Sequence, residues 1–211
     1  MSGRVRLLIA ACGLLYAGFC HATPDFAGER ASDDARYAAA RVLAGADHQG
    51  RPFAIVDKKQ ARIHVFDPAG RLLGAAAVLL GIGPGDLAPG DPGRGAGALG
   101  LDERTTPAGR FDTAPGRNDK GEAIVWIDYA QALAIHRLRP GPARERRAAR
   151  LASPTPADNR VSAGCIVVPV AFYQSVIAPV LGARRGVVYV LPESRPVRAL
   201  FDAVEIGLAA Q

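Results

Sequence analysis

Cys165 is the residue whose type and surroundings point most directly to chemistry. It follows the small, flexible run Ser162-Ala-Gly164 and precedes an apolar run that begins at Ile166. A thiolate is a strong nucleophile, and a nearby imidazole makes it available at neutral pH. Glycine lets the backbone approach a substrate closely, and backbone N–H groups at such a turn can stabilise an oxyanion. The segment therefore indicates nucleophilic catalysis, with a buried structural cysteine as the alternative.

A cysteine nucleophile needs a base, and His136 is the best placed histidine. It ends the apolar run from Ala132 to Ile135, and catalytic side chains are often found where a strand meets a loop. His64 alternates with apolar neighbours on an expected hairpin and is predicted to be exposed, while His48 lies in a polar turn. All three precede Cys165, an order that argues against papain-like peptidases. A structural role for His136 stays open.

Other catalytic plans find less support in the sequence. There is no Cys-x-x-Cys or His-Glu-x-x-His pattern, and the histidines are far apart, so we expect no metal and no cofactor. A Gly-x-Ser-x-Gly nucleophile turn is also absent.

Residues 1–22 have the pattern of a secretory signal peptide. Arg4 and Arg6 precede an apolar run from 7 to 19, which is shorter than the ~20 residues that span a bilayer. Cleavage near Ala22 would leave Cys165 as the single cysteine, unable to form an internal disulfide. We expect an exported protein, in the periplasm, without stable membrane insertion. The alternatives are an uncleaved anchor or a lipoprotein modified at Cys12.

The remaining elements must position Cys165 and His136, and strands dominate the middle of the chain. With 49% hydrophobic and 22% charged residues, the composition is that of a folded domain. Ser32 is a good cap for a helix that ends near Gly45. Strands are expected over 53–56, 61–66, 71–80, 123–129, 133–138 and 187–191, and further helices over 171–181 and 197–208. The predicted class is mainly β or α+β, with a lead and helix (23–51), one β-rich catalytic domain (52–192) and a C-terminal helix (193–211).

Several motifs together resemble the L,D-transpeptidase catalytic domain of the YkuD type. That family has a histidine, a variable stretch and then Ser-His-Gly-Cys, which Ile135-His136 and Ser162-Ala-Gly-Cys165 approach. Residues 55–70 are similar to its opening hairpin, 106–111 (Thr-Pro-Ala-Gly-Arg-Phe) to its Thr-Pro-x-Gly-x-Phe/Tyr segment, and 186–190 to its closing strand. The resemblance covers roughly Pro52 to Leu191.

The resemblance implies an enzyme that acts on peptidoglycan stem peptides without metal or nucleotide. Cys165 would attack the carbonyl of the third stem residue and release D-alanine, and the thioester would pass to an amine. His136 would move the protons. Gly164, Ser162 and Arg160 would shape the oxyanion and substrate site.

Two departures from the family pattern bear on this expectation. Ala163 replaces the histidine before Gly-Cys and removes one polar contact, while Val167 replaces an arginine after Cys-Ile. Water in place of the amine would give an L,D-carboxypeptidase or amide hydrolase. A non-catalytic wall-binding module is the other alternative, and Ala163 favours it.

The chain is basic, with 26 Lys+Arg against 20 Asp+Glu and a net charge of +6. Nearly all of the cations are arginines, which is typical of a GC-rich genome, and we expect no nucleic-acid partner. Segment 139–159 carries Arg144, Arg146, Arg147 and Arg150. It is either a basic lid over anionic stem peptides or a solvated loop.

Overall fold

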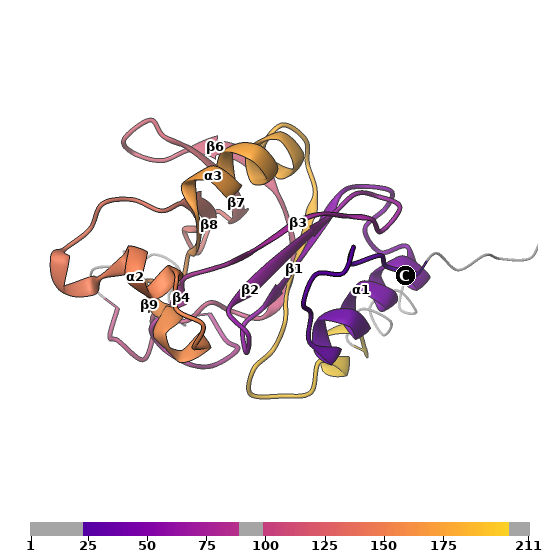
Figure 1. Ribbon diagram of the computed structural model, residues 1–211, viewed down its shortest axis with the longest axis horizontal. Coiled ribbons are helices and arrows are strands. Elements are labelled where there is room, and N and C mark those ends of the chain that lie inside the picture. Colours follow the sequence, from indigo (N-terminus) through magenta and orange to yellow (C-terminus); the bar gives the residue numbers. More distant parts are fainter. Residues whose placement is uncertain (1–22, 89–98, 203–211) are drawn as a thin grey trace, which may run out of the picture.

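The structure is a computed structural model that describes residues 23–88 and 99–202 (Figure 1). The predicted signal peptide and residues 203–208 of the predicted C-terminal helix lie outside the described residues. The chain is helical over 198–202, where that last helix was expected to begin.

Helix α1 (Asp33–Gly45) begins where the sequence predicts. The Ser32 hydroxyl accepts a hydrogen bond from the N–H of Ala35 at 3.0 Å, and two aspartates in the first turn favour the positive end of the helix dipole. The helix ends as Ala46 turns into the left-handed region, with φ of 49°. Its alanine-rich face is fully buried against the sheet.

A five-stranded sheet forms the centre of the fold, in the order β3-β2-β1-β11-β5. Its strands are β1 (Phe53–Asp57), β2 (Arg62–Phe66), β3 (Leu72–Ala77), β5 (Gly109–Asp112) and β11 (Val187–Val190). The first three form an antiparallel meander, as expected, and β11 lies parallel to β1.

A second sheet carries the segments that contain His136 and the residues after Cys165. Its order is β10-β8-β7-β6, from β6 (Ala114–Arg117), β7 (Ala123–Asp128), β8 (Leu133–Arg137) and β10 (Ile166–Val168). The short strands β4 (Leu80–Gly81) and β9 (Arg160–Ser162) pair in parallel and form a separate two-stranded sheet. In the second sheet, the parallel pairing of β8 with β10 sets segments far apart in the sequence side by side.

The core lies in two layers on the two faces of the five-stranded sheet. One layer packs between the sheets. It is covered by helix α3 (Val170–Phe172), which continues as a π-helix (Tyr173–Gly182). The other packs against α1, on the side of the sheet away from β7 and β8 (Figure 1). Strand alternation explains the split, since successive residues of β1 and β11 supply the two layers in turn.

The arginine-rich segment contains short helical turns, and most of its residues are exposed to solvent. It contains a 3-10 turn η2 (Ala143–Glu145), helix α2 (Arg147–Leu151) and a second 3-10 turn η3 (Pro156–Asn159). Leu151 packs with Leu79 and Val167 in a small third cluster. The role of the segment as a lid stays a prediction.

The predicted β-rich, α+β class is confirmed. The sequence prediction lacked β5 and β6, because both are half-exposed and β6 contains a proline and a glycine, which are unfavourable in strands. It had the helix over 171–181 in place, although much of that helix is a π-helix with Pro179 inside.

The cap of α1 gives a first test. Replacing Ser32→Ala removes the acceptor for the Ala35 N–H and also the hydroxyl that donates to Asp57. We expect the free energy of unfolding to fall by about 1–2 kcal/mol in urea titration. Ser32→Thr keeps a capping hydroxyl and serves as the control; equal losses in both variants would contradict the capping role.

Candidate active site

The strand register brings the residues that directly follow Cys165 beside the strand that contains His136. Strand β10 runs parallel to β8, with Ile166 opposite Ile135 and Val167 opposite His136. Both isoleucines face the core, so their neighbours in sequence face the other way. Cys165 is thus two positions from the partner of His136 on the adjacent strand. If the strand spacing of ~4.8 Å and the rise of ~3.3 Å per residue are continued to Cys165, its Cα atom and that of His136 are about 8 Å apart.

The imidazole of His136 is held in one tautomer. Nδ1 lies 2.8 Å from the carbonyl oxygen of Arg137, so Nδ1–H donates and Nε2 keeps its lone pair. Burial lowers the pKa of His136 to about 4, with Arg139 and Arg147 acting in the same direction. The hydrogen bond to the Arg137 backbone opposes this shift only in part. His136 is therefore neutral at pH 7 and able to accept a proton.

Cys165 is partly exposed, and its thiol is uncharged in this state. The Sγ atom lies 3.6 Å from the carbonyl oxygen of Ala132, to which it donates. Burial raises the pKa of the thiol, while hydrogen bonds from the backbone at Ala134 and Cys165 and the charge of Arg139 lower it. The pair is consequently a neutral thiol and a neutral imidazole, which needs proton transfer during attack.

The turn before Cys165 is fixed by Ser162 and Gly164. The Ser162 hydroxyl donates to the carbonyl of Cys165 at 2.7 Å and accepts from the N–H of Gly164 at 3.1 Å. Gly164 has φ of +127°, and a Cβ there would lie 2.7 Å from the Thr105 carbonyl oxygen. Both the backbone angle and the close approach therefore require glycine at this position. Its N–H is already bonded to Ser162, so its role as an oxyanion donor stays a prediction.

Thr106 connects this turn to the rest of the fold. Its hydroxyl donates to the Gly164 carbonyl at 2.7 Å and accepts from the N–H of Gly81 at 2.9 Å. The side chain is fully buried. This gives the threonine of the Thr-Pro segment noticed in the sequence a structural role, because it holds the backbone next to Cys165.

A buried charge cluster that the sequence did not reveal supports Thr106. The Lys58 ammonium donates to the carbonyls of Gly85 and Thr106 and to Asp86, at 2.6, 2.9 and 2.8 Å. It is 1% exposed, and Glu193 lies 3.6 Å away. Hydrogen bonds from Lys58, Ser194 and the Glu193 N–H outweigh desolvation and hold the pKa of Asp86 well below its usual range. The sequence signal that could have indicated this cluster is Lys58 itself, a lysine directly after an apolar strand in a chain whose cations are nearly all arginines.

The structure places Arg160 in this cluster. Its guanidinium pairs with Glu193 and donates to the carbonyl of Lys58 at 3.2 Å. These contacts hold β9 to the end of β1. The predicted substrate-binding role of Arg160 stays a prediction, and its contacts in this structure are structural.

The two departures from the family pattern have clear surroundings. Ala163 is exposed, so a side chain at this position faces solvent. Val167 is fully buried between Leu79 and Leu151, which leaves no space for a charged side chain there.

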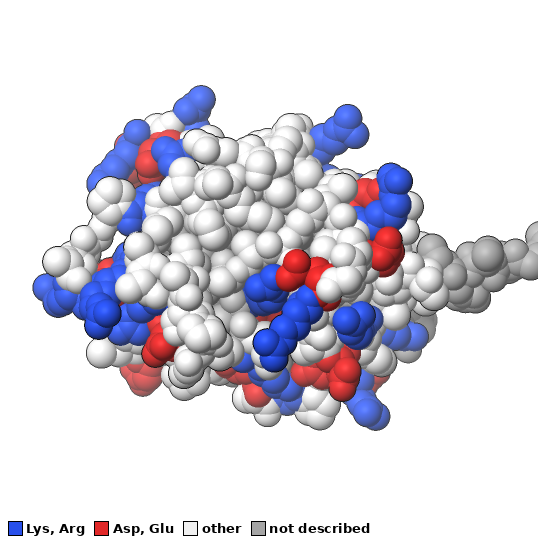
Figure 2. All heavy atoms as spheres, in the orientation of Figure 1, with Lys and Arg blue, Asp and Glu red and all other residues white. Residues whose placement is uncertain are grey.

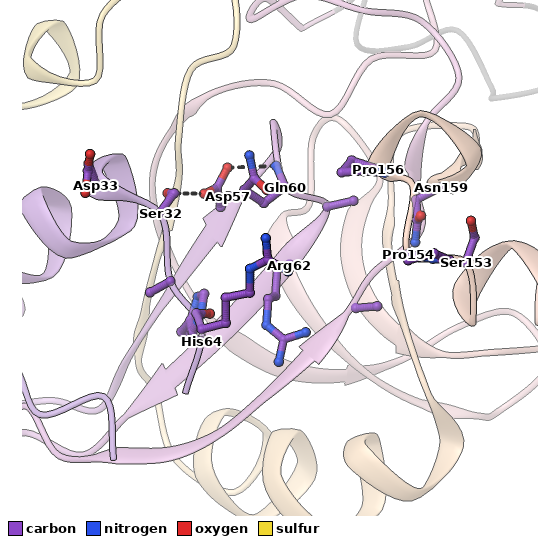
Figure 3. Close-up of a pocket in the computed structure, with 14 residues that line it drawn as sticks. Ser32, Asp33, Asp57, Gln60, Arg62, His64, Ser153, Pro154, Pro156 and Asn159 are labelled. Carbon is purple, nitrogen blue, oxygen red and sulfur yellow. Dashed lines mark hydrogen bonds between the residues drawn. The ribbon is translucent and has the colours of Figure 1, made fainter. Parts of the chain in front are cut away.

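A larger pocket than any that borders β8 in the described residues lies elsewhere, beside α1 (Figure 3). It measures about 760 Å³ and is lined by residues 30–33, the β1–β2 hairpin and segment 153–159, but by neither Cys165 nor His136. His64, on its wall, was predicted to be exposed, and that prediction is wrong: the residue is 1% exposed. Its Nε2 donates to the carbonyl of Arg30 at 3.1 Å, and Phe26 contacts it edge-on, because the N-terminal segment covers this face.

Within residues 23–88 and 99–202, no group of three His, Cys, Asp or Glu side chains is arranged to hold a metal ion. In the same residues, no helix combines the length and apolar character needed to cross a membrane.

Among known proteins, matches to this chain are found in solved structures. No protein-family model matches the sequence, and no curated protein does. An L,D-transpeptidase from Xylanimonas cellulosilytica is 16% identical with a TM-score of 0.41, over 67% of this chain and 60% of that one. An Enterococcus faecium L,D-transpeptidase is 16% identical with a TM-score of 0.37, over 67% and 50%. The helical cell shape determining protein Pgp2 from Campylobacter jejuni is 13% identical with a TM-score of 0.43, over 69% and 49%.

The matched structures include members of the family that the sequence motifs resemble. The chain spans between about half and three fifths of their lengths. At these identities and TM-scores the matches carry no argument about activity, which has to rest on the residues of the site.

The Lys58 cluster yields a prediction about stability. Replacing Lys58→Met leaves Asp86 buried without its main cation, so we expect the free energy of unfolding to fall by about 3–5 kcal/mol. The control is Lys59→Met, which breaks only the exposed pair with Asp34 and is expected to cost less than about 1 kcal/mol. Urea titration of both variants is the measurement, and similar costs would contradict the role assigned to the cluster.

Proposed function

We propose that this protein is an exported cysteine acyltransferase of the L,D-transpeptidase type, with peptidoglycan stem peptides as substrates. The observation that supports the proposal is the register of β10 on β8, which sets Val167, two residues after Cys165, opposite a tautomer-fixed His136. The motifs around both residues give the substrate class. The periplasm is the proposed compartment, after removal of residues 1–22.

The first half-reaction forms a thioester. As the Cys165 sulfur attacks the carbonyl carbon of the third stem residue, the thiol proton passes to Nε2 of His136 and the carbonyl oxygen becomes an oxyanion. Collapse breaks the C–N bond, and His136 returns the proton to the departing D-alanine amine. We assign the turn from Ser162 to Cys165 to holding the carbonyl during this step.

The second half-reaction uses an acceptor amine. The amine attacks the thioester carbonyl and gives a proton to His136, the C–S bond breaks, and the sulfur recovers the proton. The products are a new amide and free thiol. Water as the acceptor gives a carboxylic acid, which is the hydrolase alternative on the same acyl-enzyme. The second alternative is a wall-binding module without turnover, and the feature that favours it is Ala163 in place of the family histidine.

Acyl-enzyme formation tests the proposal directly. The protein without residues 1–22 is incubated with a disaccharide-tetrapeptide, and intact mass and released D-alanine are recorded. We expect an adduct on the unmodified protein and none on Cys165→Ala, with His136→Gln slowed by about 100-fold or more. D-alanine without a cross-linked product indicates the hydrolase, whereas no adduct and no D-alanine indicate the binding module.

The pH dependence follows from the lowered pKa of His136. Protonation removes the lone pair needed for general-base catalysis, so activity is lost as pH falls through the pKa of about 4. We expect kcat/KM for D-alanine release to be flat from about pH 5 to 8, with one acidic limb near pH 4. A limb near 6.5, the ordinary histidine pKa, would contradict the buried neutral imidazole.

A further inference from the structure

A second pocket lies between the end of β8 and α2, beside the catalytic pair. It has a volume of about 580 Å³ and is lined by residues 138–143 and 146–149. Three of its lining residues are arginines: Arg139, Arg146 and Arg147. None is acidic, and the rest are Gly, Ala, Pro and Leu. The pocket is therefore a small apolar cavity with an excess of positive charge.

The chain path keeps this pocket close to the nucleophile and base. It begins two residues after His136, and the N–H of Leu138 donates to the Val168 carbonyl of β10 at 2.8 Å. The charges of Arg139 and Arg147 both act on the pKa of His136, and Arg139 also acts on that of Cys165. A ligand in the pocket would thus lie within electrostatic range of the reacting groups.

The three arginines differ in how their charge is balanced. Arg139 pairs with Glu122 at 2.7 Å and Arg147 with Glu145 at 2.5 Å. Neither carboxylate lines the pocket. Arg146 is exposed, and its guanidinium has no hydrogen bond or ion pair with the residues that the structure describes. Figure 2 shows basic side chains gathered over α2. Among the described residues that line the pocket, the unpaired cation is therefore Arg146.

The segment that carries Arg146 is anchored. The Arg150 guanidinium donates to the carbonyls of Glu145 and Asp158, each at 2.9 Å, and Leu151 is buried against Leu79. Anchoring lowers the entropy lost when a guanidinium binds a ligand, and arginine binds carboxylates in a two-pronged geometry.

We propose that this pocket binds a free carboxylate of the peptide substrate, with Arg146 as the residue that contacts it. The proposal rests on the function proposed above and specifies its substrate class as an acidic peptide. Arg139 and Arg147 add positive charge on the pocket wall, and the apolar lining residues flank the ion pair that the exposed Arg146 would form.

The test compares two stem tetrapeptides that differ only in one side-chain carboxylate, free in one and converted to the carboxamide in the other. Release of D-alanine is measured at low ionic strength, where surface charges are least screened. We expect Arg146→Gln to raise KM for the free acid about tenfold or more, with kcat and the KM for the amide unchanged. Arg146→Lys should restore part of the loss.

Arg185→Gln is the matched control, since Arg185 is an exposed arginine in the turn before β11. Equal effects of Arg146→Gln on the two peptides, or an effect no larger than that of the control, would overturn the proposal. The urea midpoint of each variant shows that the fold is kept. If the unmodified protein turns over neither peptide, the proposed function fails. In that case, calorimetry measures the binding of the two peptides without turnover. If Arg146→Gln still prefers the free acid over the amide as strongly as the unmodified protein does, Arg146 does not bind the carboxylate.

Discussion

The buried ammonium of Lys58 is the contact on which the geometry of the site depends. It binds acceptors from two separate loops, at Gly85 and Thr106. Thr106 in turn holds the carbonyl of Gly164, next to Cys165. A buried charge is stable only when nearly all of its hydrogen-bonding capacity is used, so each acceptor has little freedom to move. Through Thr106, the buried charge cluster around Lys58 therefore fixes the position of the turn before Cys165.

Strand alternation gives β8 and β10 two different faces: one packs against the core between the sheets, and the other carries His136. Ile135 and Ile166 pack between the sheets, while His136 and Val167 face the other way. Because these residues belong to adjacent strands, a one-residue shift in register that moved His136 relative to the segment after Cys165 would also expose core residues. The burial of Ile135 and Ile166 therefore also fixes the spacing between the polar residues His136 and Cys165, which contribute little to stability themselves.

Much of the fold was predictable from local patterns, and so was the pairing of His136 with Cys165 as candidates. The capped helix, the opening meander and the main strands all have periodicity that a sequence displays. Long-range contacts were not accessible. Lys58 meets partners as far away as Glu193, and His64 is buried by a segment that precedes it by 34 positions. Alternation within β2 indicated only that His64 faces away from the central core, and gave no sign of what covers that face.

The path of residues 138–159 has an evolutionary consequence. The segment leaves β8 directly after His136 and returns at β9, just before the nucleophile turn, so both ends are fixed by strands. Closing a longer loop between fixed ends is inexpensive, at ~0.6 kcal/mol for each doubling of length. Insertions and deletions at its exposed positions can therefore be accommodated without moving the two strands that fix its ends. Arg139 and Arg147 are different, because their charges act on the pKa of His136, so a change at either position is felt at the end of β8.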